Sequence, residues 1–431
     1  MPKQKKKNVF TSVIIILFLL SVVIIILWNN TAPPDYLKIA PPFLIGEVPN
    51  SVIEAEAPDD IIALDLITEV PDLPGHDDII LQEHLNRALV TCMDGWIWMV
   101  NLEEMKAEPF VDAPLMAAGI RLVPDTDDKV LFCSSHLFGE TYPEVDKVGI
   151  YELTISSKEI KPIINRVPKT LLDAAVPYDN VGTVYTMDNP TVLSLDDLNE
   201  DNSRPLIFCN DLDVNKDGNR IYFSEPFAYK GASMGGGAFG EAITLGTNGL
   251  LWCVDLEKNV VYLVAQNYSF LDGVLLEYGV EYGESSVETS ILITETIKFR
   301  IVRLIISGDD AGSDQILWDN LPGMPDGMDR DANGNIWVGL LKSRSNVITW
   351  AHAHPWVKHF MLRLPQSRLP IPKETGFMEL SPDGREALYY TMHDGTRLSD
   401  ISVVVPGNDA IYLPNFQKGN NGLNKIEYPL R

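Results

Sequence analysis

Short runs rich in Ile, Val, Tyr, Trp and Phe recur along most of the chain, and Gly, Asp, Asn and Pro bound them. This pattern is typical of short β-strands separated by tight turns. A turn and a short strand precede each of the stronger runs, and another strand follows most of them. The strong runs begin at Arg87, Lys129, Arg220, Ser290, Asn335 and Ala410. Six such units predict an all-β fold, a six-bladed β-propeller.

In a propeller, the innermost strand of each blade starts at the central channel, so equivalent residues of different blades meet near the axis. We assign residues 61–431 to the propeller. Two insertions interrupt the repeat, at about residues 166–204 and 226–247. We expect both insertions to form loops on one face, where propellers usually place their specificity.

Two segments fit the opening of an EF-hand calcium loop, D-x-[DN]-x-[DN]-G: Asp213–Gly218 and Asp329–Gly334. Neither has the Glu required at the twelfth position, where Ser224 and Leu340 stand. Both lie between predicted strands, whereas an EF-hand needs flanking helices. Because Asn, Asp and Gly tolerate positive φ, we predict hairpin turns at both places.

The N-terminus combines a basic tail with an uncharged apolar tract. Four lysines lie within residues 1–8, and residues 9–28 carry no charge. Twenty residues of helix extend about 30 Å, the thickness of a bilayer core. No A-x-A cleavage site follows, so we expect an uncleaved signal anchor with a cytoplasmic tail. We interpret residues 29–60 as a Pro-rich stalk with a lead-in strand. We expect everything after the anchor to be extracytoplasmic, in the periplasm, an organelle lumen or the extracellular space.

The composition of the chain limits the classes of molecule that it could bind. The formal net charge is −26, which argues against a nucleic-acid partner and allows cations or neutral small molecules. The four cysteines show no metal-binding spacing and lie in apolar, strand-like contexts. We interpret them as small core residues; one disulfide remains open, with no pair assigned.

Three segments carry a resemblance to a known family: "PLIFCNDLDVNKDGNRIYFSE", "SILITETIKFRIVRL" and "LPGMPDGMDRDANGNIWVGL". They resemble the strictosidine synthase-like family, which includes the adipocyte plasma membrane-associated protein and is related to the paraoxonases and gluconolactonases. The resemblance implies a six-bladed propeller and, as in many relatives, calcium-dependent hydrolysis of esters or lactones. A single N-terminal anchor also fits several members.

The resemblance also implies a metal site at the channel mouth, where relatives use a Glu, two Asn and an Asp from separate blades. Asp77 stands where Glu is usual, Asn210 matches, and Asp326 matches with Gly327 in place of the following Asn. By this matching Tyr278 replaces the remaining Asn, and we assign it to substrate binding. We therefore expect calcium at Asp77, Asn210 and Asp326; in the alternative, Asn210 and its neighbour only cap a turn.

Other residues are candidates for catalysis or substrate contact. A carboxylate or imidazole near the ion would activate water, and Asp211 and His136 are our candidates. Ser233, within a G-x-S-x-G match in a glycine-rich loop, and Asp400 are candidates for substrate contact. His352, His354 and His359 read as exposed loop histidines, with zinc binding or a general base as alternatives.

The sequence thus predicts a membrane-anchored, calcium-dependent hydrolase of small-molecule esters or lactones, arylesterase- or lactonase-like. Plant strictosidine synthase uses a Glu near the position of Ser402, so its amine–aldehyde condensation is disfavoured here. The alternative is a non-catalytic propeller that binds a ligand or a protein partner.

Overall fold

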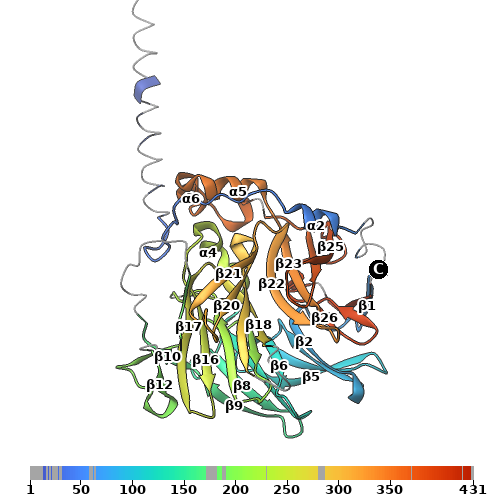
Figure 1. Cartoon of the computed structure of the whole chain (residues 1–431). Helices are drawn as coiled ribbons and strands as arrows, with labels where there is room; N and C mark the ends of the chain where they lie inside the picture. Colours follow the sequence, from blue (N-terminus) through green and yellow to red (C-terminus); the bar gives the residue numbers. More distant parts are fainter. Residues whose placement is uncertain are drawn as a thin grey trace, which may run out of the picture.

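Six antiparallel sheets surround a common axis in the computed structural model of the chain (Figure 1). The structure describes residues 13–15, 18, 21, 28, 32–57, 62, 65–170, 182–186, 191–229, 231–279, 287–369, 371–419 and 421–428. The innermost strands contact one another in a closed cycle, β2–β6–β14–β18–β22–β26 and back to β2. The predicted six-bladed propeller is therefore confirmed.

Each blade runs from an inner strand outward. The first three blades are β2 (His76–Gln82), β3 (Arg87–Cys92), β4 (Trp96–Asn101) and β5 (Lys106–Asp112); β6 (Met116–Leu122), β7 (Lys129–Ser135), β8 (Gly149–Thr154) and β9 (Glu159–Ile164); and β14 (Leu212–Val214), β15 (Arg220–Glu225), β16 (Gly249–Asp255) and β17 (Val260–Tyr268). The next two are β18 (Leu271–Tyr278), β19 (Glu288–Glu295), β20 (Arg300–Ile305) and β21 (Ser313–Trp318); and β22 (Gly323–Arg330), β23 (Ile336–Ser343), β24 (Thr375–Leu380) and β25 (Ala387–His393).

The sixth blade closes the ring with strands from both ends of the chain. It consists of β26 (Val405–Pro406), β27 (Ala410–Tyr412), β28 (Leu423–Glu427) and β1 (Ile67–Glu69). The N-terminal strand β1 pairs antiparallel with β28, with Ile67 opposite Lys425. Because β1 directly precedes the first blade in the chain, this pairing ties the N-terminal part of the propeller to the C-terminal part and closes the ring.

Burial follows the position of a strand within its blade. Each blade packs on two neighbours, so its middle strands have to be apolar on both faces, and β16 and β24 are buried at every position. The outermost strands β5 and β21 are mostly exposed. This explains why the middle strands appear in the sequence as near-continuous apolar runs.

Both EF-like segments are hairpin turns, as predicted. In the turn between β14 and β15, Asn215 Oδ1 accepts hydrogen bonds from the backbone N–H groups of Asn219 and Arg220, and Gly218 has φ +70°. In the turn between β22 and β23, Gly334 N donates to Asp331 O at 2.9 Å. Asp331 Oδ1 also accepts hydrogen bonds from the backbone N–H groups of Asn333 and Asn335, so this turn too is closed by one of its own side chains.

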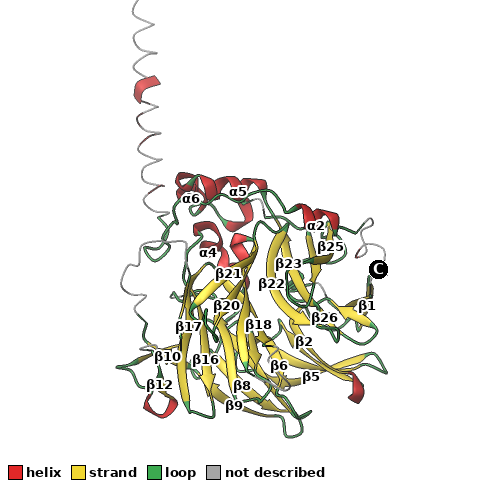
Figure 2. Cartoon of the chain, in the orientation of Figure 1, coloured by secondary structure: helices red, strands yellow, loops and turns green. Residues whose placement is uncertain are grey.

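Short helices cover one end of the propeller (Figure 2). We call η4 (Gly235–Ala238), α4 (Phe239–Thr244), α5 (Asn346–Ala353) and α6 (Pro355–Met361) the lid. The lid also receives residues 32–57, since Ala40 N donates to Thr244 O and Phe43 N to His352 O, both at 2.9 Å. That segment includes α2 (Asn50–Glu54). The remaining short 3-10 helices are η1 (Glu83–Leu85), η3 (Leu195–Asp197), η5 (Thr296–Lys298) and η6 (Gln366–Arg368).

The two predicted insertions do not share one face. The insertion at residues 226–247 carries η4 and α4 of the lid, as expected. The insertion at residues 166–204 instead supplies β10 (Arg166–Pro168), β11 (Thr183–Val184) and β12 (Leu193–Ser194), while β13 (Ser203–Pro205) lies at its end. Strands β11 and β12 extend the third blade by pairing with its outer strand β17. Because β17 is nine residues long, it offers pairing positions to both.

The structure pairs two of the four cysteines, Cys133 and Cys209, in a disulfide between the second blade and the segment that leads into the third. Cys92 and Cys253 are free and buried, as predicted for core residues. No helix in the described part of the chain is long and apolar enough to cross a membrane. Most of the predicted anchor and all of the basic tail lie outside the described residues.

Candidate functional site

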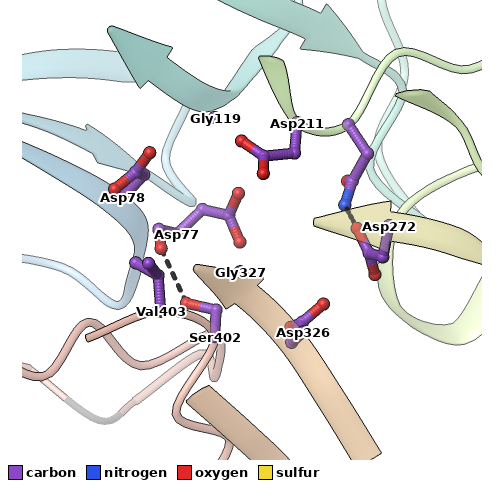
Figure 3. Close-up of a pocket in the computed structure, with 10 residues that line it drawn as sticks. Asp77, Asp78, Gly119, Asp211, Asp272, Asp326, Gly327, Ser402 and Val403 are labelled. Atoms are coloured by element: carbon purple, nitrogen blue, oxygen red, sulfur yellow. Dashed lines mark hydrogen bonds between the residues drawn. The ribbon is translucent and has the colours of Figure 1, made fainter. Parts of the chain in front are cut away.

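Every blade contributes to one small cavity on the propeller axis (Figure 3). The contributions come from equivalent places, at or just before the inner strand. The lining residues are Asp77 and Asp78, Gly119, Asn210 and Asp211, Asp272, Asp326 and Gly327, and Ser402 and Val403. Asp77, Asn210, Asp211 and Asp326, all predicted as site residues, are thus brought together.

Irregularities in the inner strands aim these residues at the axis. The register with the next strand shifts between His76 and Ile79, between Ala117 and Ile120, between Leu271 and Val274, and between Pro325 and Met328. A β-bulge bends its strand and re-aims a side chain. The shifts enclose Asp77, Asp272 and Asp326, whose side chains lie around the cavity in Figure 3.

Glycines allow the inner segments to approach closely. A Cβ on Gly119 would lie 2.6 Å from Asp211 Oδ1, and one on Gly273 would lie 2.3 Å from Asp326 O. A Cβ on Gly327 would lie 2.8 Å from the Val403 Cβ. The absence of a side chain at position 327 is therefore required by the packing of the fifth blade on the sixth.

Hydrogen bonds connect all six neighbouring pairs of blades at this level. They run from Ile120 N to Asp78 Oδ2 (3.1 Å), Gly119 N to Asn210 O (2.9 Å), Val274 N to Asp211 Oδ2 (2.8 Å), Thr294 Oγ1 to Asp326 O (3.0 Å), Gly327 N to Ser402 O (2.7 Å) and Ser402 Oγ to Asp77 O (2.6 Å). The backbone around the cavity is thereby held in place from every side.

Asp77, Asn210, Asp272 and Asp326, which we call the axial cluster, face one another across the cavity. Asn210 Nδ2 donates to Asp272 Oδ1. Burial raises the pKa of Asp77 well above its usual range, and the carboxylates of Asp78, Asp272 and Asp211 raise it further. Burial and the Asp272 carboxylate likewise raise the pKa of Asp326. Like charges confined in a low-dielectric site oppose ionisation.

The cavity has a volume of about 20 Å³, enough for one water-sized species. Its side-chain donors are all oxygens apart from the amide nitrogen of Asn210. As the side chains stand, the described residues contain no group of three or more His, Cys, Asp or Glu that could hold a metal ion.

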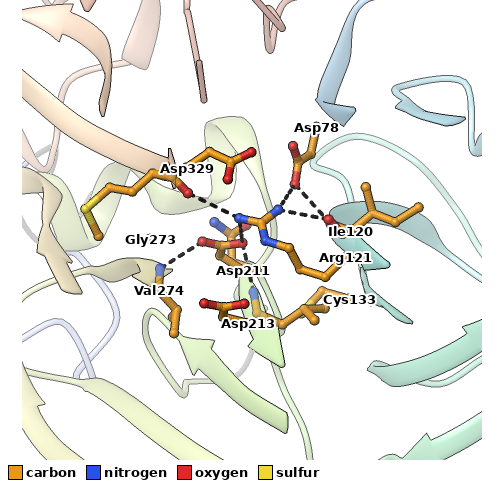
Figure 4. Close-up of polar contacts among 12 residues, drawn as sticks. Asp78, Ile120, Arg121, Cys133, Asp211, Asp213, Gly273, Val274 and Asp329 are labelled. Atoms are coloured by element: carbon orange, nitrogen blue, oxygen red, sulfur yellow. Dashed lines mark hydrogen bonds and ion pairs between the residues drawn. The ribbon is translucent and has the colours of Figure 1, made fainter. Parts of the chain in front are cut away.

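A buried arginine lies next to the axial cluster (Figure 4). Arg121 Nη1 donates to Asp78 Oδ2 at 2.6 Å, and its Nη2 lies 3.7 Å from Asp211 Oδ1. Burial alone would lower the pKa of Arg121, but Asp78, Asp211, Asp329 and Asp213 raise it overall. One cation from the second blade thus partly balances four carboxylates of the first, third and fifth blades.

The structure corrects the assignment of Tyr278. Asp272, the second residue of β18, occupies the place in the axial cluster expected of Tyr278, whereas Tyr278 ends the same strand. The Tyr278 ring packs under Lys216 of the β14–β15 turn, with the ammonium 4.2 Å from the ring centroid. Two Gly-Val pairs lie six residues apart, in "LDGV" and "EYGV", and the matching took the second. The first, at 271–274, was the signal for Asp272.

The remaining candidates lie at different distances from this site. Asp211 lines the cavity, with hydrogen bonds from Leu212 N and Val274 N. His136 is exposed and does not line the cavity. Ser233 is buried in the loop before η4, well after the end of β15, so no strand leads directly into it as an elbow requires. Asp400 lies in the wall of a second cavity beneath the lid.

Two of the three histidines in "WAHAHPWVKH" lie on helices, His352 on α5 and His359 on α6, and His354 is the residue between the two helices. Ser345 caps α5 by accepting a hydrogen bond from Ile348 N at 3.4 Å, and Pro355 begins α6. His352 is buried on α5, while His354 and His359 are not. The expectation of three exposed loop histidines is therefore wrong for His352, because the helix turns that side chain inward.

Fold and site define the chain as a six-bladed β-propeller with a carboxylate-rich cavity on its axis. Its homologues are the adipocyte plasma membrane-associated and strictosidine synthase-like proteins, which confirms the resemblance. It is 28% identical to the adipocyte plasma membrane-associated protein of Salmo salar over 229 residues, 50% of each chain. It is also 28% identical to the human protein of that name, over 49% of this chain and 50% of that one.

Plant sequences match as well. Strictosidine synthase-like 10 of Arabidopsis thaliana is 28% identical over 39% of this chain and 42% of its own. The chain thus spans about half the length, or less, of these curated relatives in the matched regions. No family model matches it. A solved putative gluconolactonase is 12% identical, with a TM-score of 0.49 over 89% of this chain and 97% of that one.

Proposed function

We propose that this protein is a membrane-anchored hydrolase of esters or lactones that works with a calcium ion at the axial cavity. The proposal depends on one observation: four blades each place one residue of the axial cluster around the cavity at the starts of the inner strands. Hydrogen bonds between all neighbouring blades fix the backbone there, which suits a preorganised site. The resemblance to calcium-dependent relatives supports the same ion and reaction class.

The axial cluster suits a hard divalent cation. Three carboxylates and one amide supply oxygen ligands, and no cysteine or histidine lines the cavity. Calcium accepts irregular sets of carboxylate, amide, carbonyl and water oxygens, whereas magnesium demands near-octahedral geometry. Burial, together with neighbouring carboxylates, raises the pKa values of Asp77 and Asp326, and a bound cation would offset both effects. Asp77, Asn210, Asp272 and Asp326 would hold the ion.

A bound calcium ion would supply a Lewis acid that polarises an ester carbonyl and stabilises the developing oxyanion. Asp211 would act as general base on the attacking water, since it lines the same cavity. Hydrogen bonds from Leu212 N and Val274 N, each at 2.8 Å, fix the direction of its carboxylate. The proton taken from water would then pass to the leaving alkoxide oxygen.

The function is tested with a panel of aryl esters and lactones, using the full chain in detergent micelles with calcium or with a chelator. We expect calcium-dependent hydrolysis that Asn210→Ala lowers by about tenfold or more, in the range seen when a metal site is disturbed. A calcium-dependent thermal shift without hydrolysis of any member would favour the non-catalytic binding propeller. Absence of both effects would reject the proposal.

Calcium should stabilise the protein more at high pH than at low pH. Asp77 and Asp326 have folded pKa values above their unfolded ones. In the metal-free protein, the stability tied to them is present below about pH 4 and is lost as the pH rises through the raised values. Calcium requires the ionised ligands and reverses that loss.

Thermal unfolding of the metal-free protein, with and without added calcium, at about pH 5 and at about pH 8, measures the difference. An equal or larger rise in unfolding temperature at pH 5 would contradict the prediction.

We further propose that residues 9–28 anchor the protein and that the lid faces the membrane, with the propeller extracytoplasmic. Trp28 lies beside Arg363, which follows α6, and the Arg363 guanidinium is 3.7 Å from the Trp28 ring centroid. Trp350, Trp356 and Phe360 of the lid are 47%, 69% and 55% exposed, as suits side chains at a bilayer interface. The animal homologues are named plasma membrane-associated proteins, which supports this location. Protease added to the cytoplasmic side of sealed vesicles should spare the propeller; its digestion would refute the topology.

A further inference from the structure

A second, larger cavity lies beneath the lid. Its volume is about 390 Å³, at the lower end of the roughly 300–1,000 Å³ of pockets for drug-sized ligands. Phe239 and Ile243 of α4 and Ile348 of α5 form part of one wall, and residues at the starts of inner strands form another. We call this space the lid cavity.

The lid cavity adjoins the axial cavity. Phe270, Met324 and Asp400 line the lid cavity, and the residues two positions later, Asp272, Asp326 and Ser402, line the axial cavity. Residues only two positions apart in the chain thus line the two spaces at three of the inner segments. Thr296 connects the two spaces, because it lines the lid cavity and lies beside Asp272. The two cavities are therefore neighbours, separated by Thr296.

The walls of the lid cavity are mostly apolar, and their charges are already paired. Aromatic and aliphatic side chains dominate the lining, among them Phe138, Phe239, Phe270, Ile297, Met324 and Phe416. Lys342 Nζ lies 2.6 Å from Asp400 Oδ1, and Lys418 pairs with Glu140. A ligand with a net charge would enter this space without a matching ion, at a high desolvation cost.

His352 marks where a polar group of the ligand would bind. It lines the lid cavity and is 1% exposed, and its Nδ1 is buried with no hydrogen-bond partner among the described residues. Burial, together with the nearby Lys358, lowers the pKa of His352 to about 3, so the imidazole is neutral. A buried polar atom without a partner is rare in native proteins, and a ligand can supply the partner.

We propose that the lid cavity binds the apolar body of a neutral aliphatic or aryl ester or lactone, with a neutral polar group of that ligand hydrogen-bonded to His352. This proposal rests on the proposed function for the reacting end of the ligand, which lies at the axial cluster. It adds the substrate class: neutral, mostly apolar molecules, with charged acids excluded.

The test is photolabelling of the full chain in micelles with a neutral aryl alkyl ketone that carries a diazirine, a probe that mimics an ester but is not hydrolysed. We expect labelled peptides from α4, α5 and the start of β22, and competition by a neutral ester but not by the matching carboxylate. His352→Phe should lower labelling by about tenfold, the equivalent of one lost hydrogen bond to a buried group. The matched change His359→Phe, at an exposed histidine of the same lid, should leave it unchanged.

Labelling of the wild type outside the lid cavity, or equal competition by ester and carboxylate, would overturn the proposal without relying on any variant. The experiment also separates this proposal from the proposed function. Asn210→Ala should lose hydrolysis and retain specific labelling, because Asn210 lines only the axial cavity. Specific labelling in a wild type that hydrolyses nothing would uphold the binding site and reject the enzyme.

Discussion

Replacing Asp272 by Asn should abolish the stabilisation by calcium and lower ester hydrolysis by roughly 100-fold or more, about 2.7 kcal/mol of transition-state stabilisation. Asp272 accepts a hydrogen bond from Asn210 and adjoins Asp326, so it lies between two other members of the axial cluster. The substitution preserves the shape of the side chain but removes a charge that the ion requires. Calcium-dependent thermal shifts and kcat/KM for an aryl ester measure the two effects.

Tyr278→Phe is the matched control, because Tyr278 lies on the same strand but outside the axial cavity. Both effects should remain at wild-type levels in this variant. If Tyr278→Phe loses calcium stabilisation while Asp272→Asn retains it, the assignment of the fourth ligand is wrong.

Replacing Arg121 by Met should destabilise the fold by about 3–5 kcal/mol, the usual cost of removing one partner from a buried ion pair. Arg121 is the cation that faces Asp78, Asp211, Asp213 and Asp329, and both partners in its ion pair with Asp78 are nearly buried. Met fills a similar volume, so the loss reports the uncompensated carboxylates rather than a cavity. Denaturant unfolding measures the change in free energy.

The control for Arg121→Met is Lys106→Met, which breaks an exposed ion pair with Glu104. Exposed pairs contribute about 0–1 kcal/mol, so this variant should unfold close to the wild type. Equally small changes in the free energy of unfolding for the two substitutions would show that the contacts of Arg121 with the four carboxylates do not hold the blades together.

The repeat of turn and strand was enough to predict the propeller, and the family resemblance then pointed to three members of the axial cluster. Asp77, Asn210 and Asp326 each mark the start of a recognisable unit, and the blades bring equivalent starts to one axis. Asp272 was missed because two Gly-Val pairs lie six residues apart in the sequence, and sequence spacing alone does not say which lies at the channel mouth. The bulge at Leu271–Val274 makes that choice.

The lid and the role of Arg121 could not be predicted from the sequence, for different reasons. Two start signals of the lid helices, the N-cap Ser345 of α5 and the first residue Pro355 of α6, are visible in the sequence, but the helices are too short for periodicity to reveal them. Arg121 reads as an isolated charge in "AAGIRLV", and its partners come from other blades. Only the closed ring shows that these distant residues surround it.

The central claim is that the inner strands converge on a calcium site, and anomalous X-ray scattering from crystals grown with calcium tests it most directly. We predict one strong anomalous peak on the propeller axis, bounded by Asp77, Asn210, Asp272 and Asp326. An axis without a peak at saturating calcium, or a peak only at a hairpin turn such as Asn215–Gly218, would contradict the account.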